Sequence, residues 1–357
     1  MKVLLVIHGL DCVGGTERVT THIANLLAEK GNQVSVLSLT SVGSSPAFTL
    51  NGDVTLLQPK RTYSSLRKHL HQLWQVIQVR KQFDVVIASD TQLCLYVWPL
   101  KLLSKAKVVA WEHFNSQVVT RFGSRWFGRK IAARLFDKIV VLTEQDKVSW
   151  QDKYQPHPPV SVIPNPCAMT VRSSIEAASI KRVVSVGRFT SQKGFDFLVR
   201  AWSLIPATTR EQWQLHIVGP TGSASKEVAL LIAKLQLEDQ VIIAGASHNM
   251  EQVYDSSAIY VMSSRYEGFG MTLVEAMARG LAVIAYNCPM GPKEIIDDQF
   301  GIIVPAESIE LLAQSLSALI EDNQLRSHYQ QQALIGVKRY VPSKIAAQWQ
   351  QEIQTLY

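Results

Sequence analysis

The sequence lacks any long apolar stretch. No run approaches the roughly 18 apolar residues that a membrane-spanning helix needs. At the start, MKVLLVIHG joins one lysine to an apolar run of only five residues, which predicts a first strand over 2–7 rather than a signal peptide. Since nearly half of the residues are apolar and glycine and proline are near average, the sequence predicts a globular protein.

Cysteine is also scarce. The four cysteines, at positions 12, 94, 167 and 288, are widely separated, and no two have the spacing of metal ligands. This usage fits a reducing cytosol rather than a disulfide framework. The dinucleotide fingerprint Gly-x-Gly-x-x-Gly is absent from the glycine loop that follows the first strand, HGLDCVGGTERV, so an NAD site is not inferred.

Acidic residues are rare in one region. Residues 60–138 hold 15 Lys or Arg against four acids, a net charge of +11, whereas the whole chain carries +7 and the rest therefore −4. Such a basic region favours an anionic surface or an anionic acceptor as partner. Nucleic acid is the weaker interpretation, because no recognisable reading module accompanies the charge, and we expect no nucleic acid partner.

The length of 357 residues predicts two domains. A cluster of prolines, at 156, 158, 159, 164 and 166, marks the boundary between them. The expected organisation is an N-terminal domain over 1–164, a C-terminal domain over 165–340, and a final helix over 341–357.

The stretch 257–295 carries the clearest pattern. An apolar strand-length run at 258–262 is followed by the glycine-bearing loop 263–270, a helical pattern that ends at Gly280, and a second buried strand at 281–285. Parallel strands joined by a crossover helix form half of a nucleotide-binding unit.

This loop has the composition of a phosphate site. Gly268 and Gly270 remove side chains before a helix N-terminus, so the backbone N–H groups of Phe269, Gly270, Met271 and Thr272 would face an anion. Glu267 and Glu275 flank the loop, and carboxylates beside a diphosphate suit sugar hydroxyls. A solvated surface role remains the alternative for either glutamate.

The segment EGFGMTLVEAMARG, with seven residues between Glu267 and Glu275, resembles the Glu-(seven)-Glu signature of retaining glycosyltransferases of family 4. The resemblance implies the GT-B fold, an α/β architecture of two Rossmann-like doubly wound domains facing across a cleft. Its other motifs follow in family order along nearly the whole chain. The final helix after Pro342 would then cross back to the N-terminal domain.

Two basic residues of the second domain extend the resemblance. GRFTSQKG supplies Arg188 and Lys193 after a strand at 182–186, where a guanidinium and an ammonium can neutralise a leaving diphosphate. Because Asp-x-Asp, which holds a divalent ion in glycosyltransferases of the other major fold, is absent, we expect transfer without a metal and without a cofactor. In PNPC the family's Val-Asp pair after the hinge motif is replaced by Cys167 and Ala168.

Two features of the first domain also resemble the family. GGTER places Gly14 and Gly15 where the family's loop faces the donor diphosphate, although a plain glycine turn is the alternative. His113 follows the strand 107–111, in the position where a family histidine bonds the donor sugar, although a lone histidine is often structural. Glu112 is either its orienting partner or only a neighbour.

Two basic stretches are amphipathic. In the helix expected at 66–83, the inward residues would be Leu66, Leu70, Leu73, Ile77 and Phe83. The stretch 121–138 interleaves Arg and Lys with aromatic residues, including Trp126 and Phe127, and can lie on an anionic membrane surface or form an ordinary half-buried helix. We expect a peripheral membrane contact through residues 60–138.

The resemblance implies a hexosyltransferase that moves a hexose or N-acetylhexosamine from a UDP-sugar, with retention. Arg188, Lys193 and the 269–272 amides would hold the diphosphate, Glu275 the ribose, and Glu267 and His113 the donor sugar. The acceptor would be a polyprenyl-diphosphate-linked saccharide in capsule, exopolysaccharide or O-antigen assembly, on the cytoplasmic face of the inner membrane. The alternatives are a soluble GT-B synthase or phosphorylase and a non-catalytic nucleotide-binding protein.

Overall fold

The computed structural model describes residues 1–40, 45–59, 65–118, 122–175 and 180–357. The side chains of 65–68 also lie outside the described part, and with them the predicted inward position of Leu66; so does Arg121, the first residue of the basic aromatic stretch. The chain forms two compact units: unit 1 comprises Met1–Ala168 and Val341–Tyr357, and unit 2 comprises Met169–Tyr340.

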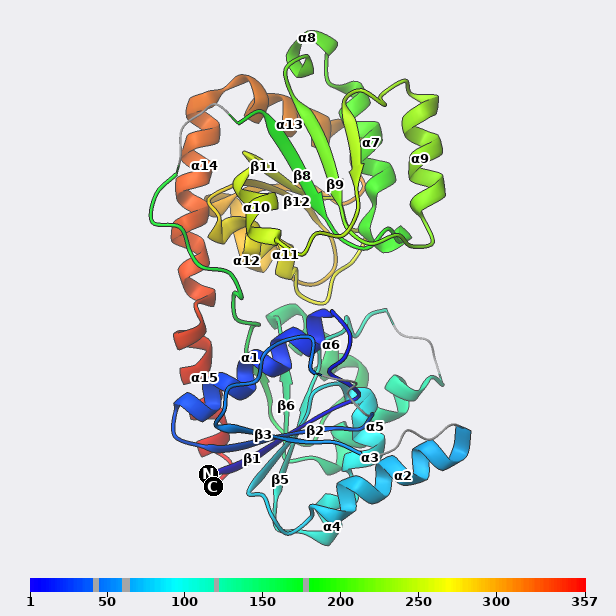
Figure 1. Ribbon diagram of the computed structural model, residues 1–357, viewed down its shortest axis with the longest axis vertical. Coiled ribbons are helices and arrows are strands. Elements are labelled where there is room, and N and C mark those ends of the chain that lie inside the picture. Colours follow the sequence, from blue (N-terminus) through cyan, green and yellow to red (C-terminus); the bar gives the residue numbers. More distant parts are fainter. Residues whose placement is uncertain (41–44, 60–64, 119–121, 176–179) are drawn as a thin grey trace. The chain divides into compact units, whose positions relative to one another are not determined.

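Unit 1 is built on a parallel sheet of seven strands within the described residues, in the order β3-β2-β1-β4-β5-β6-β7 (Figure 1). The strands read as continuous apolar runs because helices cover both faces of the sheet. Their bounds are β1 Lys2–Ile7, β2 Gln33–Ser38, β3 Val54–Leu57, β4 Val85–Ala88, β5 Lys107–Trp111, β6 Lys138–Val141 and β7 Val160–Val162.

The helices of unit 1 connect successive strands. They are α1 Gly15–Glu29, α2 Ser65–Gln78, α3 Cys94–Val97, α4 Leu100–Leu103, α5 Ser124–Leu135, α6 Glu144–Tyr154 and the C-terminal α15 Pro342–Gln354. In α1 the apolar residues Val19, Ile23, Leu26 and Leu27 recur at helical spacing and are buried.

The C-terminal helix α15 packs on this unit. The Trp349 ring contacts Trp111 edge to face, with 4.8 Å between ring centroids. Asn32 Nδ2 donates to Gln350 Oε1 at 2.7 Å, and Ser161 Oγ donates to Glu352 Oε1 at 2.8 Å. The last helix therefore adds apolar and polar contacts to the core of unit 1, although it is 341 residues from the start of the chain.

The prediction for α2 is wrong at one residue. Leu70 was expected to face inward, yet it is 60% exposed, whereas Val76 on the same helix is fully buried. The stripe that packs on the core contains Leu73, Val76 and Val79, followed by Phe83. Leucine spacing alone suggested the face through Leu70, but tertiary packing selected the neighbouring face.

Unit 2 repeats the architecture with six parallel strands in the described residues, in the order β10-β9-β8-β11-β12-β13. The strands are β8 Arg182–Val186, β9 Gln214–Val218, β10 Val241–Ala244, β11 Ile259–Met262, β12 Ala282–Asn287 and β13 Ile302–Pro305. The helices are α7 Phe195–Leu204, α8 Ala207–Arg210, α9 Ser225–Lys234, α10 Met250–Asp255, α11 Met271–Ala278, α12 Pro292–Phe300, α13 Ile309–Glu321 and α14 Asn323–Gly336. The predicted pair of doubly wound α/β domains is confirmed.

Both sheets reverse their strand order at one point, between β1 and β4 in unit 1 and between β8 and β11 in unit 2. Ligands of doubly wound sheets bind beyond the carboxyl ends of the strands at such a point. Among the described residues, no helix has the length and apolar character needed to cross a bilayer.

Candidate active site

In unit 2, the reversal point brings together two residues that the sequence singled out. Lys193 ends a short 3-10 turn, Ser191–Lys193, that follows β8, and Glu267 follows the neighbouring strand β11. Their side chains form an ion pair, with 2.7 Å between Lys193 Nζ and Glu267 Oε1. A cation and a carboxylate therefore meet at the carboxyl edge where a nucleotide would bind.

A serine completes this pair. Ser264 Oγ donates a hydrogen bond of 2.6 Å to the same oxygen, Glu267 Oε1, and Ser264 is buried. The Glu267 side chain is only 8% exposed, so these two donors replace the water that a carboxylate needs. Sequence analysis missed Ser264, for which the only signal was its place three residues before Glu267.

The two loops are joined through their backbones. Arg265 N donates to Gln192 O at 2.8 Å, and Ser263 Oγ donates to Lys193 O at 3.0 Å. Gly194 permits this approach, because its φ is +59° and a Cβ there would lie 2.0 Å from Ser263 O. The position of Lys193 relative to Glu267 is thus fixed by backbone contacts.

A second ion pair holds the same loops from outside. Arg265 donates to both carboxylate oxygens of Asp196, at 2.9 and 2.8 Å, and its guanidinium lies 4.0 Å from the centre of the Phe197 ring. The bidentate contact lowers the pKa of Asp196 against the opposing effect of its burial. This clamp connects the start of α7 to the loop after β11.

The predicted phosphate loop lies at the N-terminus of α11. Gly270 is the N-cap residue, with φ +115°, and the first backbone N–H groups of a helix have no partner within the helix. Gly291 supports the loop from the next strand connection: its φ is +102°, and a Cβ there would lie 1.7 Å from Phe269 O. The Phe269 side chain is buried, so a ligand at this loop would contact the backbone N–H groups rather than the phenyl ring.

Glu275 lies further along α11 and is buried. Tyr254 donates its hydroxyl proton to Glu275 Oε2 at 2.9 Å, and Tyr260 OH shares a hydrogen bond of 2.7 Å with Thr272 Oγ1. Burial raises the pKa of Tyr260 far above its ordinary value, so this hydroxyl keeps its proton. The sequence did not indicate either tyrosine, because both contacts depend on helix packing.

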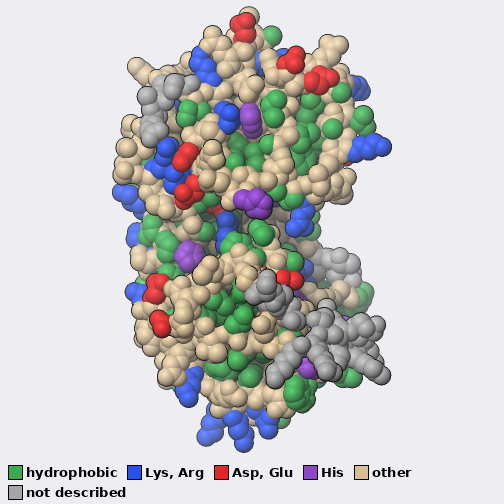
Figure 2. Space-filling view, viewed as in Figure 1, with side chains coloured by type: hydrophobic (Ala, Val, Ile, Leu, Met, Phe, Trp, Pro, Cys, Tyr) green, Lys and Arg blue, Asp and Glu red, His purple; other side chains and the backbone are tan. Residues whose placement is uncertain are grey.

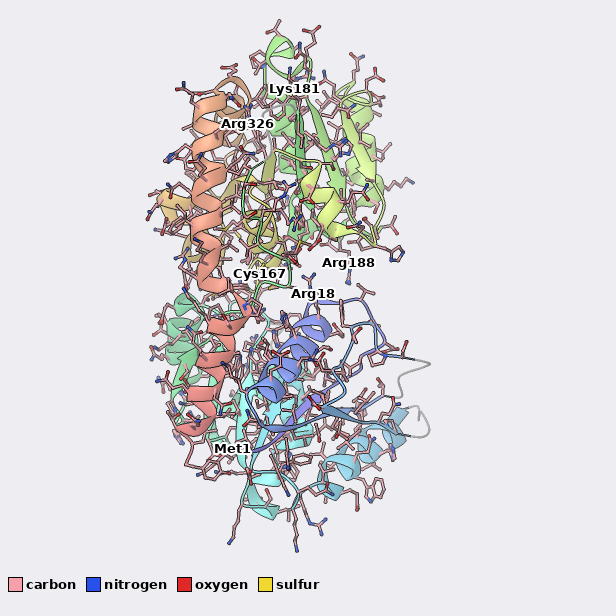
Figure 3. All side chains as sticks on the ribbon, turned by 60° about the vertical axis from the view of Figure 1, so that its left-hand side comes forward. Met1, Arg18, Cys167, Lys181, Arg188 and Arg326 are labelled. Carbon is pink, nitrogen blue, oxygen red and sulfur yellow. The ribbon has the colours of Figure 1, made fainter. Side chains whose placement is uncertain are left out.

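Arg188 is not part of the ion-paired cluster. Its side chain is exposed (Figure 3), and its stem lies beside Gly222, where a Cβ would be 3.4 Å from Arg188 Cγ. The structure therefore brings Lys193, Glu267 and the α11 N-terminus together, but leaves the Arg188 guanidinium in solvent.

Unit 1 places His113 after β5. Its ring packs on Trp111, with 4.2 Å between ring centroids, and burial lowers its pKa to about 4. The imidazole is therefore neutral at physiological pH, which suits a group that hydrogen-bonds an uncharged hydroxyl.

Glu112 is a structural neighbour of His113 rather than its partner. It forms a fully buried ion pair with Arg129 and accepts hydrogen bonds of 3.0 Å from Thr91 Oγ1 and from the Phe114 backbone N–H. Arg129 also donates to Phe114 O at 3.1 Å. The pair fixes the loop that carries His113.

Gly14 and Gly15 lie at the N-terminus of α1. Gly14 is the N-cap, and a Cβ there would lie 2.1 Å from Glu17 Oε2, so the glycine lets this carboxylate fold back toward the helix start. Burial raises the pKa of Glu17, and the nearby acids Asp11 and Asp90 act in the same direction. Gly15 has open space around it.

Asp90 is a site residue that sequence analysis missed. It follows β4 at the reversal point of unit 1, is buried, and forms a bidentate pair with Arg125 at 3.2 and 2.8 Å. The Arg125 guanidinium stacks 3.7 Å from the centre of the Phe114 ring. Two arginines of the basic stretch 121–138, Arg125 and Arg129, are therefore held by ion pairs within unit 1.

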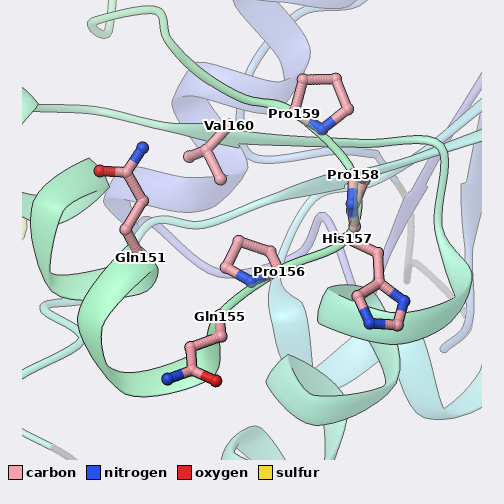
Figure 4. A pocket seen from close by; sticks show the side chains of 7 residues that line it. All are labelled: Gln151, Gln155, Pro156, His157, Pro158, Pro159 and Val160. Atoms are coloured by element: carbon pink, nitrogen blue, oxygen red, sulfur yellow. The ribbon is translucent and has the colours of Figure 1, made fainter.

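A separate hollow of about 550 Å³ lies beside the proline-rich segment 156–159 (Figure 4). Its lining residues end at Val160, the first residue of β7, so it lies at the amino end of that strand, whereas His113 follows the carboxyl end of β5. Glutamines, prolines and His157 line it, and we assign it no chemistry. Within the described residues, no group of three His, Cys, Asp or Glu side chains has the geometry to hold a metal ion.

Two doubly wound units with such residues at the reversal points are typical of α/β enzymes that bind nucleotides. Family models confirm and refine this class: "Glycosyl transferases group 1" matches residues 173–334, and "Glycosyltransferase Family 4" matches residues 13–169. The amylovoran biosynthesis glycosyltransferase AmsD of Erwinia amylovora is 32% identical over 98% of both chains. The chain therefore belongs to the family 4, group 1 glycosyltransferases.

Solved structures agree on the fold. Sucrose-phosphate synthase from Thermosynechococcus elongatus superposes with a TM-score of 0.82 at 20% identity, covering 99% of this chain and 98% of that one. HepE from Anabaena in complex with UDP-glucose superposes with a TM-score of 0.81 at 18% identity, covering 99% and 100%. The GT-B fold that the sequence motifs implied is confirmed.

Proposed function

We propose that this glycosyltransferase moves a hexose or N-acetylhexosamine from a UDP-sugar to a lipid-linked saccharide during cell-surface polysaccharide synthesis, with retention at the anomeric carbon. The observation that carries the proposal is the Lys193–Glu267 ion pair at the reversal point of unit 2, close in sequence to the α11 N-terminus. The family fixes the reaction type, and the pair supplies one group for the leaving diphosphate and one for the sugar.

Each residue has a distinct task in this proposal. Lys193, Arg188 and the backbone N–H groups of residues 269–272 neutralise the leaving diphosphate, which removes the need for a metal ion. Glu275 accepts from the nucleotide ribose. In transfer with retention, the acceptor oxygen attacks from the face that the diphosphate leaves, and a phosphate oxygen takes the acceptor proton.

Glu267 and the neutral His113 hydrogen-bond hydroxyls of the donor sugar. Because Oε1 of Glu267 already accepts hydrogen bonds from Lys193 and Ser264, the sugar hydroxyl donates to Oε2. Gly14 and Gly15 contact the donor phosphates in this proposal, and the Glu17 carboxylate must then leave the start of α1.

The UDP-sugar donor is supported by the fold shared with HepE, whose structure contains UDP-glucose. The polysaccharide pathway is supported by the similarity to AmsD, an amylovoran biosynthesis enzyme. The basic region 60–138 suits a lipid-linked acceptor, because that acceptor resides at an anionic membrane surface. We therefore propose a peripheral enzyme on the inner face of the cytoplasmic membrane.

Calorimetry with a panel of UDP- and GDP-sugars tests the donor, and transfer to a synthetic polyprenyl-diphosphate saccharide tests the acceptor. We expect one UDP-sugar to bind and to be transferred equally well in EDTA, with the anomeric configuration kept in the product by NMR. Binding of GDP-sugars alone would overturn the UDP assignment. Transfer only to a soluble sugar or sugar phosphate would instead indicate a synthase.

A further inference from the structure

Helix α2 exposes an apolar side to solvent. Leu70 is 60% exposed and Trp74 is 54% exposed, one helical turn apart on the same face. The His71 ring stacks on Trp74, with 5.6 Å between centroids. Large apolar side chains gathered on an outer face indicate a surface that has a partner.

The opposite side of α2 is buried and mixed, because Val76 packs on the core beside two glutamines. Gln72 and Gln75 are 2% and 8% exposed, and Gln72 Nε2 and Gln75 Oε1 have no hydrogen-bond partner among the described residues. A helix that faces only water places glutamines outward and Leu and Trp inward. Two glutamines thus lie on the buried side of α2 while Leu70 and Trp74 lie outward, which is consistent with an apolar medium that covers the outer side.

Exposed leucines also occur on α4, which packs against α2 (Figure 1). Leu102 and Leu103 are 72% and 49% exposed there. They border a hollow of about 550 Å³, whose other lining residues include Arg80, Lys81 and Lys105. We name the surface formed by Leu70, Trp74, Arg80, Lys81, Leu102, Leu103 and Lys105 the α2–α4 face.

The charge around this face is mostly positive. From residue 69 to residue 107, where the structure describes the side chains, there are five Lys or Arg and two acids, Asp84 and Asp90. Asp84 accepts a hydrogen bond of 2.7 Å from the Lys2 backbone N–H, and Asp90 is paired with Arg125. Lys and Arg side chains gather at the α4 end of unit 1 (Figure 2). An anionic partner is therefore favoured over a neutral one.

We propose that the α2–α4 face docks on an anionic phospholipid bilayer. The inference deepens the membrane contact of the proposed function and, within the predicted region 60–138, assigns it to α2 and α4 rather than to the aromatic stretch 121–138. Leu70, Trp74, Leu102 and Leu103 enter the headgroup boundary, while the longer Arg80, Lys81 and Lys105 side chains reach the lipid phosphates. Stable peripheral binding needs both signals, and this face supplies both.

Flotation with vesicles of phosphatidylcholine, with and without phosphatidylglycerol, tests the proposal. We expect the full-length protein to float only with phosphatidylglycerol present. The double variant Leu70→Ser/Trp74→Ser should bind at least about tenfold more weakly, because two large apolar side chains no longer enter the lipid. Lys81→Glu/Lys105→Glu should lose a similar factor at low salt.

Matched controls come from unit 2. Leu204→Ser/Leu230→Ser changes two leucines that are 54% and 61% exposed, and Lys226→Glu/Lys234→Glu makes the same charge change on α9. Both control proteins should float like the parent. UDP binding and the melting temperature, both measured by calorimetry, should stay unchanged in all of these variants, which confirms that both units are folded.

Three outcomes would overturn the α2–α4 face. The first is that the parent protein does not bind the vesicles. The second is that the α2 variants float like the parent while Trp126→Ser/Phe127→Ser does not. The third is that sedimentation shows a dimer, which Trp74→Ser dissociates, and that no vesicle binding occurs. The proposed function fails independently, through absence of UDP-sugar transfer in the parent protein.

Discussion

The Lys193–Glu267 ion pair allows a quantitative test. Changing Lys193 to Met removes the ammonium but keeps most of the stem, which crosses Gly187 closely enough that a Cβ there would lie 2.9 Å from Lys193 Cε. Glu267, 8% exposed, then keeps Ser264 as its remaining side-chain donor among the described residues. Changing Glu267 to Gln instead leaves the Lys193 ammonium without its carboxylate partner. Because the Lys193 side chain is 18% exposed, water can solvate this ammonium better than it can solvate the more buried Glu267 carboxylate.

The expected loss of folding stability follows from the exposed fractions of these two side chains. A hydrogen bond to a charged group contributes about 1.5–3 kcal/mol, whereas breaking a fully buried pair costs about 3–5 kcal/mol. Because Lys193 is partly solvated, we expect Lys193→Met to lower the free energy of unfolding of unit 2 by about 2 kcal/mol. Glu267→Gln should cost less, and the double variant should regain most of the loss, a coupling energy of about 1.5–2 kcal/mol.

Calorimetric melting of the four proteins measures this cycle. A loss of about 2 kcal/mol should lower the melting temperature of a unit of this size by about 4–8 °C. Lys226→Met, at an exposed lysine on α9, is the matched control and should melt like the parent. If the two single changes were additive within about 0.5 kcal/mol, the two side chains would not be interacting in the folded protein, and the site described for unit 2 would be incorrect.

Three further changes test other parts of the molecule. Arg129→Met leaves Glu112 buried without its cation and should lower the unfolding free energy of unit 1 by about 3–5 kcal/mol in denaturant titration; an unchanged midpoint would contradict the buried pair. Burial raises the pKa of Asp146 to about 7, so its stabilising contribution is lost as pH rises from about 4 through 7. Asp146→Asn should therefore melt above the parent at pH ~8 but not at pH ~4, and parallel melting curves would refute this. Gly291→Ala forces a Cβ against Phe269 O, so calorimetry should show UDP binding weakened at least about tenfold, whereas Gly52→Ala, which has open space, should bind normally.

Several features of the fold and site followed from local sequence alone. Parallel strands buried on both faces need continuous apolar runs, so strands such as 2–7, 107–111 and 182–186 were located with their observed bounds. The Glu267–Glu275 loop was predicted because a glycine-bearing turn between a strand and a helix has few other uses. Lys193 was singled out because GRFTSQKG resembles the family motif and an ammonium there can neutralise a diphosphate.

Tertiary structure decided which side chains became hydrogen-bond partners. Ser263 and Lys193 are 70 residues apart in sequence, and only the adjacency of β8 and β11 brings their loops together. Tyr254 on α10 meets Glu275 on α11, 21 residues later in the chain. No local pattern encodes which donor a buried carboxylate will find.

The sequence by itself determined the strand and helix pattern, the family, and the residue types at both reversal points, because these depend on periodicity and on motifs a few residues long. Tertiary structure decided which of the basic residues stay exposed for contact with a partner. Arg125 and Arg129 are paired inside unit 1, whereas Lys81 and Lys105 remain on its surface. It also decided which face of α2 is outward, since a helix with apolar residues on two sides has two possible orientations and only packing against the core selects one.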